Sequence, residues 1–558
     1  MMEELTPQIL SVLLFIVVIA VPILTLMLSA LMLWRYRRAV IREMAITGGF
    51  DVPAPHAPGS SKAANPAVRD LYAHGRDLCR RAIRGPWHLA IRYTVAGLTF
   101  ALVFALAWRF VFAYRLGVPG FLLSVWIYAW PAVLALLLIV PGSTRLRTSC
   151  VAGYFVMLLL LGLWASSITD IPALKFGGTV LPARSSVTPV GMMKIWLVAN
   201  GIPTVLILLC FDRRVRAVAP LVLGFMTTAI SGTLVVWFAL FTHRGIDAAV
   251  ALSVSLDLHV VWLVVATLAL SLAGFGGIGW ALARWIARAY RRKTLSDQSL
   301  MMDALWLFFA SFYTMWLVWG GLGWAATAPA AFLAYKLVSA AGRRIPGREP
   351  HPARGLTFLR VFSLGERSEA LLDTVARYWR HIGSVQTITG PDVAGSTVQP
   401  HQFLDFLSRK LPSHFVRDPA SLERSMAEWD RAADPDGRFR VNNFFCQADS
   451  WQRALQRLVQ EGDAVLMDLR SFSAMNAGCI FELQHLVKDV PLSRCLLIVD
   501  DTTDEAFLEH TLKDAWERLP PESPNHTRSP EAAPLHRFGS GIPALRRVVR
   551  QLCDAAGI

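Results

Sequence analysis

The sequence predicts a multi-pass α-helical membrane domain at residues 1–340 and a cytosolic α/β domain with a doubly wound parallel sheet at residues 355–558, joined by a basic linker at 341–354. Three observations support this division. Of the 558 residues, 54% are hydrophobic and only 17% charged, outside the usual range of soluble proteins. Long apolar runs fill the first 340 residues. After residue 355, short apolar strands alternate with amphipathic helices, as in a parallel sheet covered on both faces.

The two parts of the sequence differ in net charge as well as in hydropathy. Residues 1–340 carry a net charge of +16 and residues 341–558 a net charge of −1. The high pI therefore belongs to the apolar part, where loop arginines report membrane orientation. The second part has no basic stripe with interleaved aromatic residues, so we expect no nucleic-acid partner. Seven cysteines without a CxxC pair favour neither a disulfide framework nor a zinc site, and we expect no metal.

Apolar runs long enough to cross a bilayer, which takes about 20 helical residues, predict nine crossings. The first is too long, and too acidic before its apolar run, for a signal peptide. The ninth returns from a glycine-rich turn at 320–323 to about Val338, and a re-entrant hairpin is the alternative for the last two. The other eight are Ile9–Trp34, Tyr93–Ala113, Pro119–Val140, Val151–Ile168, Met193–Phe211, Val218–Thr242, Leu258–Ala283 and Met301–Trp319.

Positive residues cluster after every second span, which predicts an outside N-terminus and a cytoplasmic C-terminal domain. Arg outnumbers Lys 47 to 8, which favours a GC-rich bacterial source, and the predicted location is the bacterial inner membrane. The orienting residues are Arg35, Arg37, Arg38, Arg42, Arg145, Arg147, Arg213, Arg214, Arg216, the basic run 284–293, Arg343, Arg344 and Arg348.

The first cytoplasmic loop, residues 35–87, contains a Pro-, Ala- and Ser-rich stretch at 51–66 and a basic amphipathic helix at 69–84. That helix is expected either at the membrane surface or as a plain solvated helix. Within the spans, Arg109, Asp303 and Lys336 lie near predicted helix ends, where their charged groups can reach the interface. A transporter is therefore the weakest of the functional hypotheses.

Residues 274–279 match a GxGxxG dinucleotide-binding motif. They lie inside an apolar span with no strand before them, which excludes the structural context that the motif requires. We interpret these glycines as small residues for close helix packing.

The predicted α/β domain has five strands, with a helical insertion at 401–432. Such sheets bind ligands beyond the carboxyl ends of their strands. This directs attention to the loops at 364–369, 390–397, 469–479 and 500–504. The predicted strands are Leu356–Leu364, Ser384–Thr389, Phe439–Phe445, Asp463–Leu469 and Arg494–Val499. The predicted helices are Glu369–His381, Asp449–Gln460, Asn476–Val487, Glu505–Leu519 and Ile542–Cys553.

Two of these loops carry reactive or binding side chains. The turn Gly-Glu-Arg-Ser-Glu at 365–369 places Arg367 and Ser368 after the first strand. The stretch from Asp468 through Asn476 to Glu482 joins a buried strand to a helix, with Glu482 in the first two helical turns. A simpler interpretation makes Glu482 a favourable helix-dipole charge, Asn476 an N-cap and Asp468 a turn residue.

The strand–helix opening of 357–381, the loop Gly-Pro-Asp-Val-Ala-Gly at 390–395 and the sequence Gly-Cys-Ile-Phe-Glu-Leu at 478–483 resemble the TIR (Toll/interleukin-1 receptor) family, a flavodoxin-like fold. The last of these is similar to that family's Trp-Cys-x-x-Glu-Leu motif, with Gly478 in place of Trp. The Asp-Leu strand end, Asn476 and Glu482 are also similar to nucleoside deoxyribosyltransferase-like domains. The resemblance covers about 150 residues of the second part.

The resemblance implies an NAD glycohydrolase with Glu482 as the catalytic carboxylate and Arg367, Ser368, Asp468 and Asn476 around the nucleotide. A carboxylate stabilises the oxocarbenium ion that forms when an N-glycosidic bond breaks. NAD is then the substrate, and no cofactor is required. The resemblance further implies a self-associating signalling or antiviral defence effector. The alternatives are a non-catalytic nucleotide- or protein-binding module coupled to a membrane sensor or pore, and a transporter with a regulatory domain.

Overall fold

The computed structural model describes residues 7–46, 68–111, 117–168, 174–176, 179–181, 189–342, 353–361, 365–390, 398–539 and 541–557. The chain forms two compact units. One, the helical unit, comprises Met1–Leu33 and Ala90–Pro346; the other, the sheet unit, comprises Trp34–Leu89 and Gly347–Ile558. The division predicted at residue 340 differs in one respect, because the described residues between Trp34 and Leu89 belong to the sheet unit. The predicted flexible stretch 51–66 and most of the linker 341–354 lie outside the described residues.

In the part of the chain that is described, eight helical segments are long and apolar enough to cross a membrane. The predicted ninth crossing corresponds to α12 (Thr327–Ala341), whose 15 residues are fewer than a full span requires. The eight segments are Ser11–Met44, Gly75–Val111, Val118–Ile139, Thr144–Ser167, Pro189–Cys210, Ala219–Leu240, Val260–Arg291 and Asp297–Gly320.

Several of these segments are subdivided, and a short antiparallel pair, β1 (Leu174–Phe176) and β2 (Thr179–Leu181), lies between two of them. The helices are α1 (Pro7–Met44), α2 (Val68–Val111), α3 (Val118–Tyr128), α4 (Trp130–Ile139), α5 (Thr144–Ile168), α6 (Pro189–Trp196), the π-helix η1 (Leu197–Gly201), α7 (Ile202–Cys210), α8 (Ala219–Leu240), α9 (His243–Ser255), α10 (Val260–Arg291), α11 (Asp297–Leu317), and the 3₁₀ turns η2 (Val318–Gly320) and η3 (Leu322–Ala326) before α12.

Large apolar side chains are distributed in opposite ways in the helical unit and in the residues after 353. On the helices of the helical unit many of them are exposed, including Phe15, Phe110, Trp262 and Leu270. Among the described residues after 353, only Met475 and Leu535 are exposed large apolar residues. An outward apolar surface of this extent is compatible with a membrane protein.

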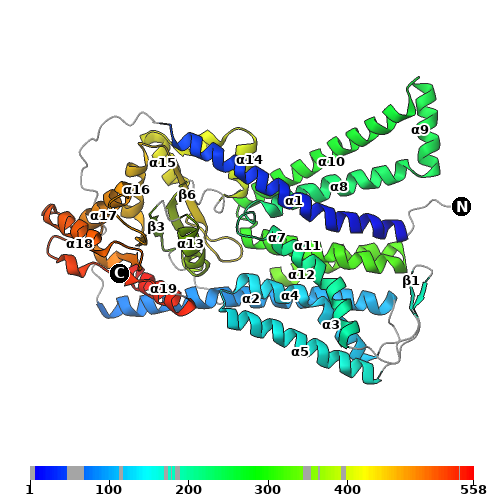
Figure 1. The fold of residues 1–558 in the computed structure, drawn as a ribbon, viewed down its shortest axis with the longest axis horizontal. Coiled ribbons are helices and arrows are strands. Elements are labelled where there is room, and N and C mark those ends of the chain that lie inside the picture. The colour runs from blue at the N-terminus through cyan, green and yellow to red at the C-terminus, as the bar shows by residue number, and fades with distance from the viewer. Residues whose placement is uncertain are drawn as a thin grey trace. The chain divides into compact units, whose positions relative to one another are not determined.

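The glycine-rich segment of α10 differs from its prediction. Figure 1 shows α8 and α10 side by side, joined at one end by α9. In this arrangement Gly279 approaches the carbonyl oxygen of Phe225 on α8 so closely that a Cβ would lie 3.0 Å from it. A Cβ on Gly274, Gly276 or Gly277 would meet no described atom within 4 Å. Close helix packing therefore accounts for one of the four glycines in residues 274–279 and not for the other three.

The sheet unit is built on seven parallel strands in the order β5-β6-β4-β3-β7-β8-β9. Without β5, chain order across the sheet is 3-2-1-4-5-6, a doubly wound order. A flavodoxin-like 2-1-3-4-5 order would result if β6 were also absent. The strands are β3 (Leu356–Arg360), β4 (Val385–Ile388), β5 (Phe415–Val416), β6 (Val441–Cys446), β7 (Ala464–Asp468), β8 (Cys495–Val499) and β9 (Leu535–Arg537).

Alternate residues of the central strands face two separate cores, as the two-residue period of a strand requires. Val465 and Met467 of β7 face one core, and Ala464 and Leu466 face the other. Helices α15 (Pro419–Ala427), α16 (Trp451–Glu461), α17 (Ala477–Asp489) and α18 (Glu505–Glu517) cover the first face, whereas α13 (Glu366–Trp379), α19 (Ile542–Ala556) and the start of α2 cover the second.

The start of α2 corrects the prediction for residues 69–84. Leu78, Cys79 and Ala82 are buried among residues of α13 and α19, including Leu371 and Leu552. The apolar face of this amphipathic helix therefore packs into a protein core, and lies neither at a membrane surface nor in solvent. The helix continues without a break to Val111 in the helical unit.

Two strands had no counterpart in the predictions. β5 lies within the supposed helical insertion, between α14 (Pro400–Leu407) and α15, and β9 lies in the Pro-rich segment before α19. Both are edge strands of two or three residues, too short to show a periodic pattern. The five predicted strands and the five predicted helices are all present, with shifts of a few residues at their ends.

Candidate functional site

The strands β3 and β7 are neighbours in the sheet, although β4, β5 and β6 lie between them in the sequence. From β3 the chain first adds strands on one side, and from β7 it adds strands on the other side, so the switch point of the sheet lies between β3 and β7. In a doubly wound sheet, ligands bind beyond the carboxyl ends of the strands at this position. The last residues of the two strands, Arg360 and Asp468, are register partners. Both are almost completely buried, so this edge of the sheet holds two opposite charges in a water-poor environment.

Asp468 is the centre of a hydrogen-bond network that joins two of the candidate ligand-binding loops, those at 364–369 and 469–479. Its carboxylate accepts a bond of 3.0 Å from the Ser368 hydroxyl at the start of α13. It also accepts two bonds of 2.7 Å from Nε and one terminal nitrogen of Arg470, a forked geometry typical of strong charge-assisted pairs. Arg470 in turn donates to the carbonyl of Arg367 over 3.0 Å. The predicted residues Arg367, Ser368 and Asp468 are therefore brought together.

Arg367 extends this network to the end of β8. Its guanidinium lies 2.5 Å from a carboxylate oxygen of Asp500 and 3.4 Å from the hydroxyl of Ser471. Burial raises the pKa of Asp500, but hydrogen bonds from Thr502 and the charge of Arg367 outweigh it, so that the pKa is lowered overall. The network thus spans the carboxyl ends of β7 and β8 and the first turn of α13.

Glu482 lies in the second turn of α17 and is 1% exposed. The thiol of Cys479 lies 3.9 Å from one oxygen of the Glu482 carboxyl group and 3.3 Å from the carbonyl oxygen of Arg360. Burial raises the pKa of Glu482 to about 8, although the charge of Arg360 and the thiol of Cys479 lower it. Glu482 is therefore a carboxyl group that is mostly protonated at neutral pH.

Cys479 links Glu482 to the Asp468 network. Burial and the charge of Glu482 raise the pKa of its thiol, the charge of Arg360 lowers it, and the charge of Asp468 raises it further. Three ionisable groups, Glu482, Arg360 and Asp468, therefore act electrostatically on this one thiol. Arg360 also donates to the hydroxyl of Thr387 and to the carbonyl of Ile388, both over 3.1 Å.

Asn476 does not form the N-cap that the sequence suggested. It precedes α17, but its side chain makes no cap to the helix; instead its side-chain oxygen accepts bonds from the backbone nitrogen of Ser473 at 2.8 Å and from the Ser473 hydroxyl at 3.2 Å. This turn holds the loop between β7 and α17, which carries the exposed Met475. The loop 391–397 and residues 362–364, which the sequence places at the same edge, lie outside the described residues.

The sequence predictions missed two residues at this edge, Arg360 and Arg470. Each had a detectable signal. Arg360 is the one charged residue in the otherwise apolar and hydroxyl-bearing run 356–361, and Arg470 follows Asp468 by two residues at a strand end. A charged side chain where a buried strand ends is a candidate for a buried partner.

In the helical unit, two of the charged residues predicted near helix ends form a pair. The Lys336 ammonium lies 2.7 Å from a carboxylate oxygen of Asp303, and the hydroxyl of Tyr335 donates to the other oxygen over 3.3 Å. Asp303 and Lys336 therefore connect α11 and α12. Arg109 lies over the ring of Phe121, 5.7 Å from its centroid.

Comparison of the chain with protein-family models, with curated proteins and with solved structures finds no match. Within the described residues, no three His, Cys, Asp or Glu side chains converge as metal ligands would. The carboxyl edge presents the protonatable buried carboxyl of Glu482, the buried guanidinium of Arg360 and the fixed Asp468–Arg470 pair. Such a set can hold an anionic, hydroxyl-bearing ligand and respond to developing positive charge.

Proposed function

We propose that the sheet unit binds NAD or a related nucleotide at the carboxyl edge of its sheet and cleaves the N-glycosidic bond, with Glu482 as the catalytic residue. One observation carries the proposal: a buried carboxyl with a pKa raised to about 8 lies beside Arg360 at the switch point between β3 and β7. Perturbed carboxyls in this position are typical of functional sites. The TIR-like resemblance of 478–483 favours the same assignment.

In this reaction the bond between the ribose anomeric carbon and the nicotinamide nitrogen breaks, and its electron pair leaves with the nicotinamide. The ribosyl cation is captured by water, which releases a proton. The ionised form of Glu482 stabilises the cation. Because Glu482 is mostly protonated at neutral pH, a bound ligand's positive charge is needed to favour ionisation.

Arg367, Ser368 and Asp468 have a positioning role in this proposal. Asp468 is held by Ser368 and Arg470, and Arg367 is held by Asp500, so these groups keep the start of α13 fixed against β7. The N-terminus of α13, with Gly365 at a positive φ of 50°, is where a ligand's phosphate would approach. Asn476 supports the loop before α17.

The protein is further proposed to act as a self-associating membrane-anchored signalling or defence effector of the bacterial inner membrane, with the sheet unit in the cytoplasm. A second candidate function has its own observation. Glu482 is 1% exposed and Asp468 is fully enclosed, which favours a module that binds a nucleotide or a protein without cleaving it. In that case the helical unit senses or forms a pore.

The test is cellular NAD, measured by mass spectrometry after inducing the full chain and the variants Glu482→Ala and Glu482→Gln. Glu482→Gln keeps the shape of the side chain and removes its charge. The matched control is Glu522→Ala, which alters an exposed carboxylate of the same unit. We expect NAD to fall with the unaltered chain and with Glu522→Ala, and to remain constant with both Glu482 variants.

Each outcome separates the two candidates. An equal fall of NAD in all four proteins would remove Glu482 from the reaction. Constant NAD in all four, with all four inserted and folded, combined with retained binding of NAD by the purified full chain, would favour the binding module. If the ionised carboxylate is the reactive form, cleavage by purified protein rises with pH and reaches a plateau above about 8.

A further inference from the structure

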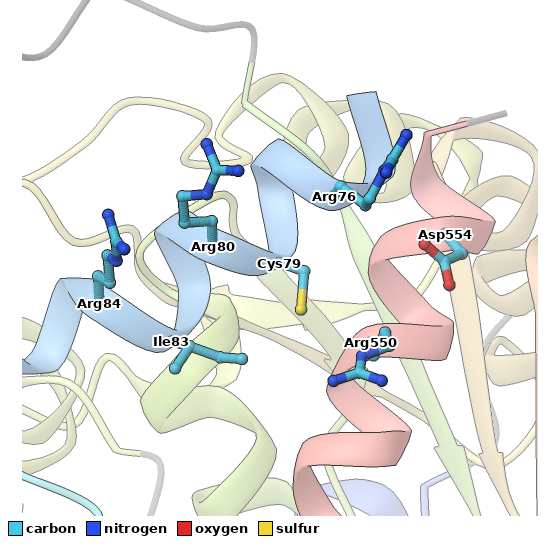
Figure 2. A pocket seen from close by; sticks show the side chains of 7 residues that line it. All are labelled: Arg76, Cys79, Arg80, Ile83, Arg84, Arg550 and Asp554. Atoms are coloured by element: carbon cyan, nitrogen blue, oxygen red, sulfur yellow. The ribbon is translucent and has the colours of Figure 1, made fainter. Parts of the chain in front are cut away.

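A pocket of about 840 Å³ lies in the sheet unit between the start of α2 and the end of α19. Figure 2 shows Arg76, Arg80 and Arg84 spaced along α2, with the side chains of Arg80 and Arg84 extending to one side of this helix, and Arg550 on α19 near Cys79. The described residues that line it are Arg76, Cys79, Arg80, Ile83, Arg84, Arg550 and Asp554. Among these residues, four carry a positive charge and one an acidic group.

This concentration of arginines opposes the stability of the fold. Arg76, Arg80 and Arg84 follow each other at intervals of four residues, so that they are neighbours on one helix face, where like charges repel. Arg80 is paired with Asp77 over 3.2 Å, but both side chains are more than half exposed, and such pairs contribute little. Asp554 is the one acid among the described residues of the lining, and burial raises its pKa. A bound anion would offset the repulsion.

The pocket is separate from the candidate site at the carboxyl edge. α19 follows β9 and runs back across the sheet, so its last turns, which carry Arg550 and Asp554, lie toward the amino ends of the strands. On α2, a Cβ added to Gly85 would lie 2.3 Å from Cγ of His381, a residue of the turn that precedes β4. This contact also places the segment after Arg84 at the amino edge.

We propose that this arginine pocket binds a phosphate-bearing anion, held by the guanidinium groups of Arg80 and Arg84, which extend to the same side of α2 (Figure 2). Guanidinium groups present paired donors that match phosphate oxygens, and they are less strongly hydrated than ammonium groups. All four basic residues of the lining are arginines and none is a lysine. The apolar part of the lining, Cys79 and Ile83, accommodates the carbon skeleton that carries the phosphate.

Two sources present this chemistry: the headgroup of an anionic phospholipid and a soluble phosphate compound. The sequence favours the lipid. Only nine residues, or about 13 Å of helix, separate Arg84 from Tyr93, where the apolar run of the same helix begins. Arginines next to a span on its cytoplasmic side attract anionic lipids.

The proposal is tested by calorimetric titration of the purified full chain in a neutral detergent at low salt. The probes are dihexanoyl phosphatidylglycerol, its zwitterionic counterpart dihexanoyl phosphatidylcholine, inorganic pyrophosphate and ATP. The test variant is Arg80→Gln/Arg84→Gln. The matched control, Arg145→Gln/Arg147→Gln, removes the same charge from exposed or partly exposed positions on α5.

We expect the test variant to bind the anionic probe about fivefold more weakly for each arginine removed, and the control to bind it like the unaltered chain. Arg80→Lys/Arg84→Lys should recover only part of the affinity, because charge remains but the forked donors are lost. Binding of phosphatidylglycerol without pyrophosphate or ATP assigns the pocket to a lipid headgroup. Binding of pyrophosphate or ATP with the same arginine dependence assigns it to a soluble phosphate.

The proposal is overturned if none of the phosphate-bearing anions binds, if phosphatidylcholine binds as tightly as phosphatidylglycerol, or if the control pair weakens binding as much as the test pair. The variants replace exposed side chains, and equal unfolding temperatures of the test and control proteins will establish that both are folded.

Discussion

Arg360 and Asp468 are register partners at the carboxyl ends of adjacent parallel strands, and each is held by partners of its own. Arg360 donates to the carbonyl of Ile388 on the β4 side, whereas Asp468 accepts from Ser368 and Arg470 on the other. Opposite charges are therefore fixed on the two sides of the strand boundary where this type of sheet binds ligands.

Replacing Asp468 by Asn should destabilise the sheet unit, because Arg470 would remain buried with its main acceptor neutralised. Breaking a buried ion pair from one side costs about 3–5 kcal/mol. The double replacement Asp468→Asn/Arg470→Met should recover a substantial part of that loss. The measurement is thermal unfolding of the full chain in detergent, followed by a thiol-reactive dye that labels the buried cysteines as they become exposed. Strictly additive losses in the double variant would contradict the pairing.

Glu482→Gln should change the pH dependence of stability. The folded pKa of about 8 exceeds the ordinary value of 4.5, so between these values the folded chain binds more protons than the unfolded chain. Stability contributed by the protonated carboxyl is full below about pH 4.5 and is lost as pH rises toward 8, by up to about 1.4 kcal/mol per pH unit. Glu482→Gln should therefore be increasingly stabilised relative to the unaltered chain from pH 5 to 8. A constant difference across that range would show that Glu482 titrates normally.

Gly85→Ala should destabilise the sheet unit even though alanine favours helix formation by about 1 kcal/mol over glycine. An added Cβ would lie 2.3 Å from Cγ and 2.7 Å from Cβ of His381, too close for the ring to avoid by rotation alone. The matched control is Gly277→Ala, whose Cβ would meet no described atom within 4 Å. Unfolding temperatures should fall for Gly85→Ala only; an increase would mean that α2 does not approach His381.

Asp303 and Lys336 should be energetically coupled. Asp303→Asn removes the negative charge that lies 2.7 Å from the Lys336 ammonium, and Lys336→Met removes the positive charge beside the Asp303 carboxylate. In a double-mutant cycle we expect a coupling of about 1 kcal/mol or more, because this part of the chain is apolar; exposed pairs usually give less. The unfolding temperatures of the four proteins, measured in detergent, give this coupling. Additive effects would return both residues to independent positions.

The strands could be predicted best where burial is complete. The run Asp463–Leu469 predicted a buried strand, and β7 occupies Ala464–Asp468, because residues buried on both faces form a continuous apolar run. β9 could not be predicted, because Leu535 and Arg537 are exposed and its three residues resemble a loop. The strand β5 could not be predicted either, because two residues are too few to show a pattern.

The candidate site could be predicted in part. Asp468 and Ser368 follow strand ends, so sheet geometry alone brings them to one edge. Arg470 and Arg360 could not be assigned, because which buried charge an aspartate pairs with depends on side-chain direction, which the pattern does not contain. The face of α2 was misassigned because the amphipathic pattern around Leu78 is the same for a membrane surface, for solvent and for a protein core.

The burial of Leu78, Cys79 and Ala82 against α13 and α19 determines how this protein can be divided for laboratory work. A truncated product that starts at residue 355 would retain every strand yet lack part of its own core, and its uncovered face would favour aggregation during expression. Supplying residues 68–89 as a separate peptide or as a fused helix should restore solubility. The sheet unit is therefore discontinuous in sequence, and a single cut cannot release it intact.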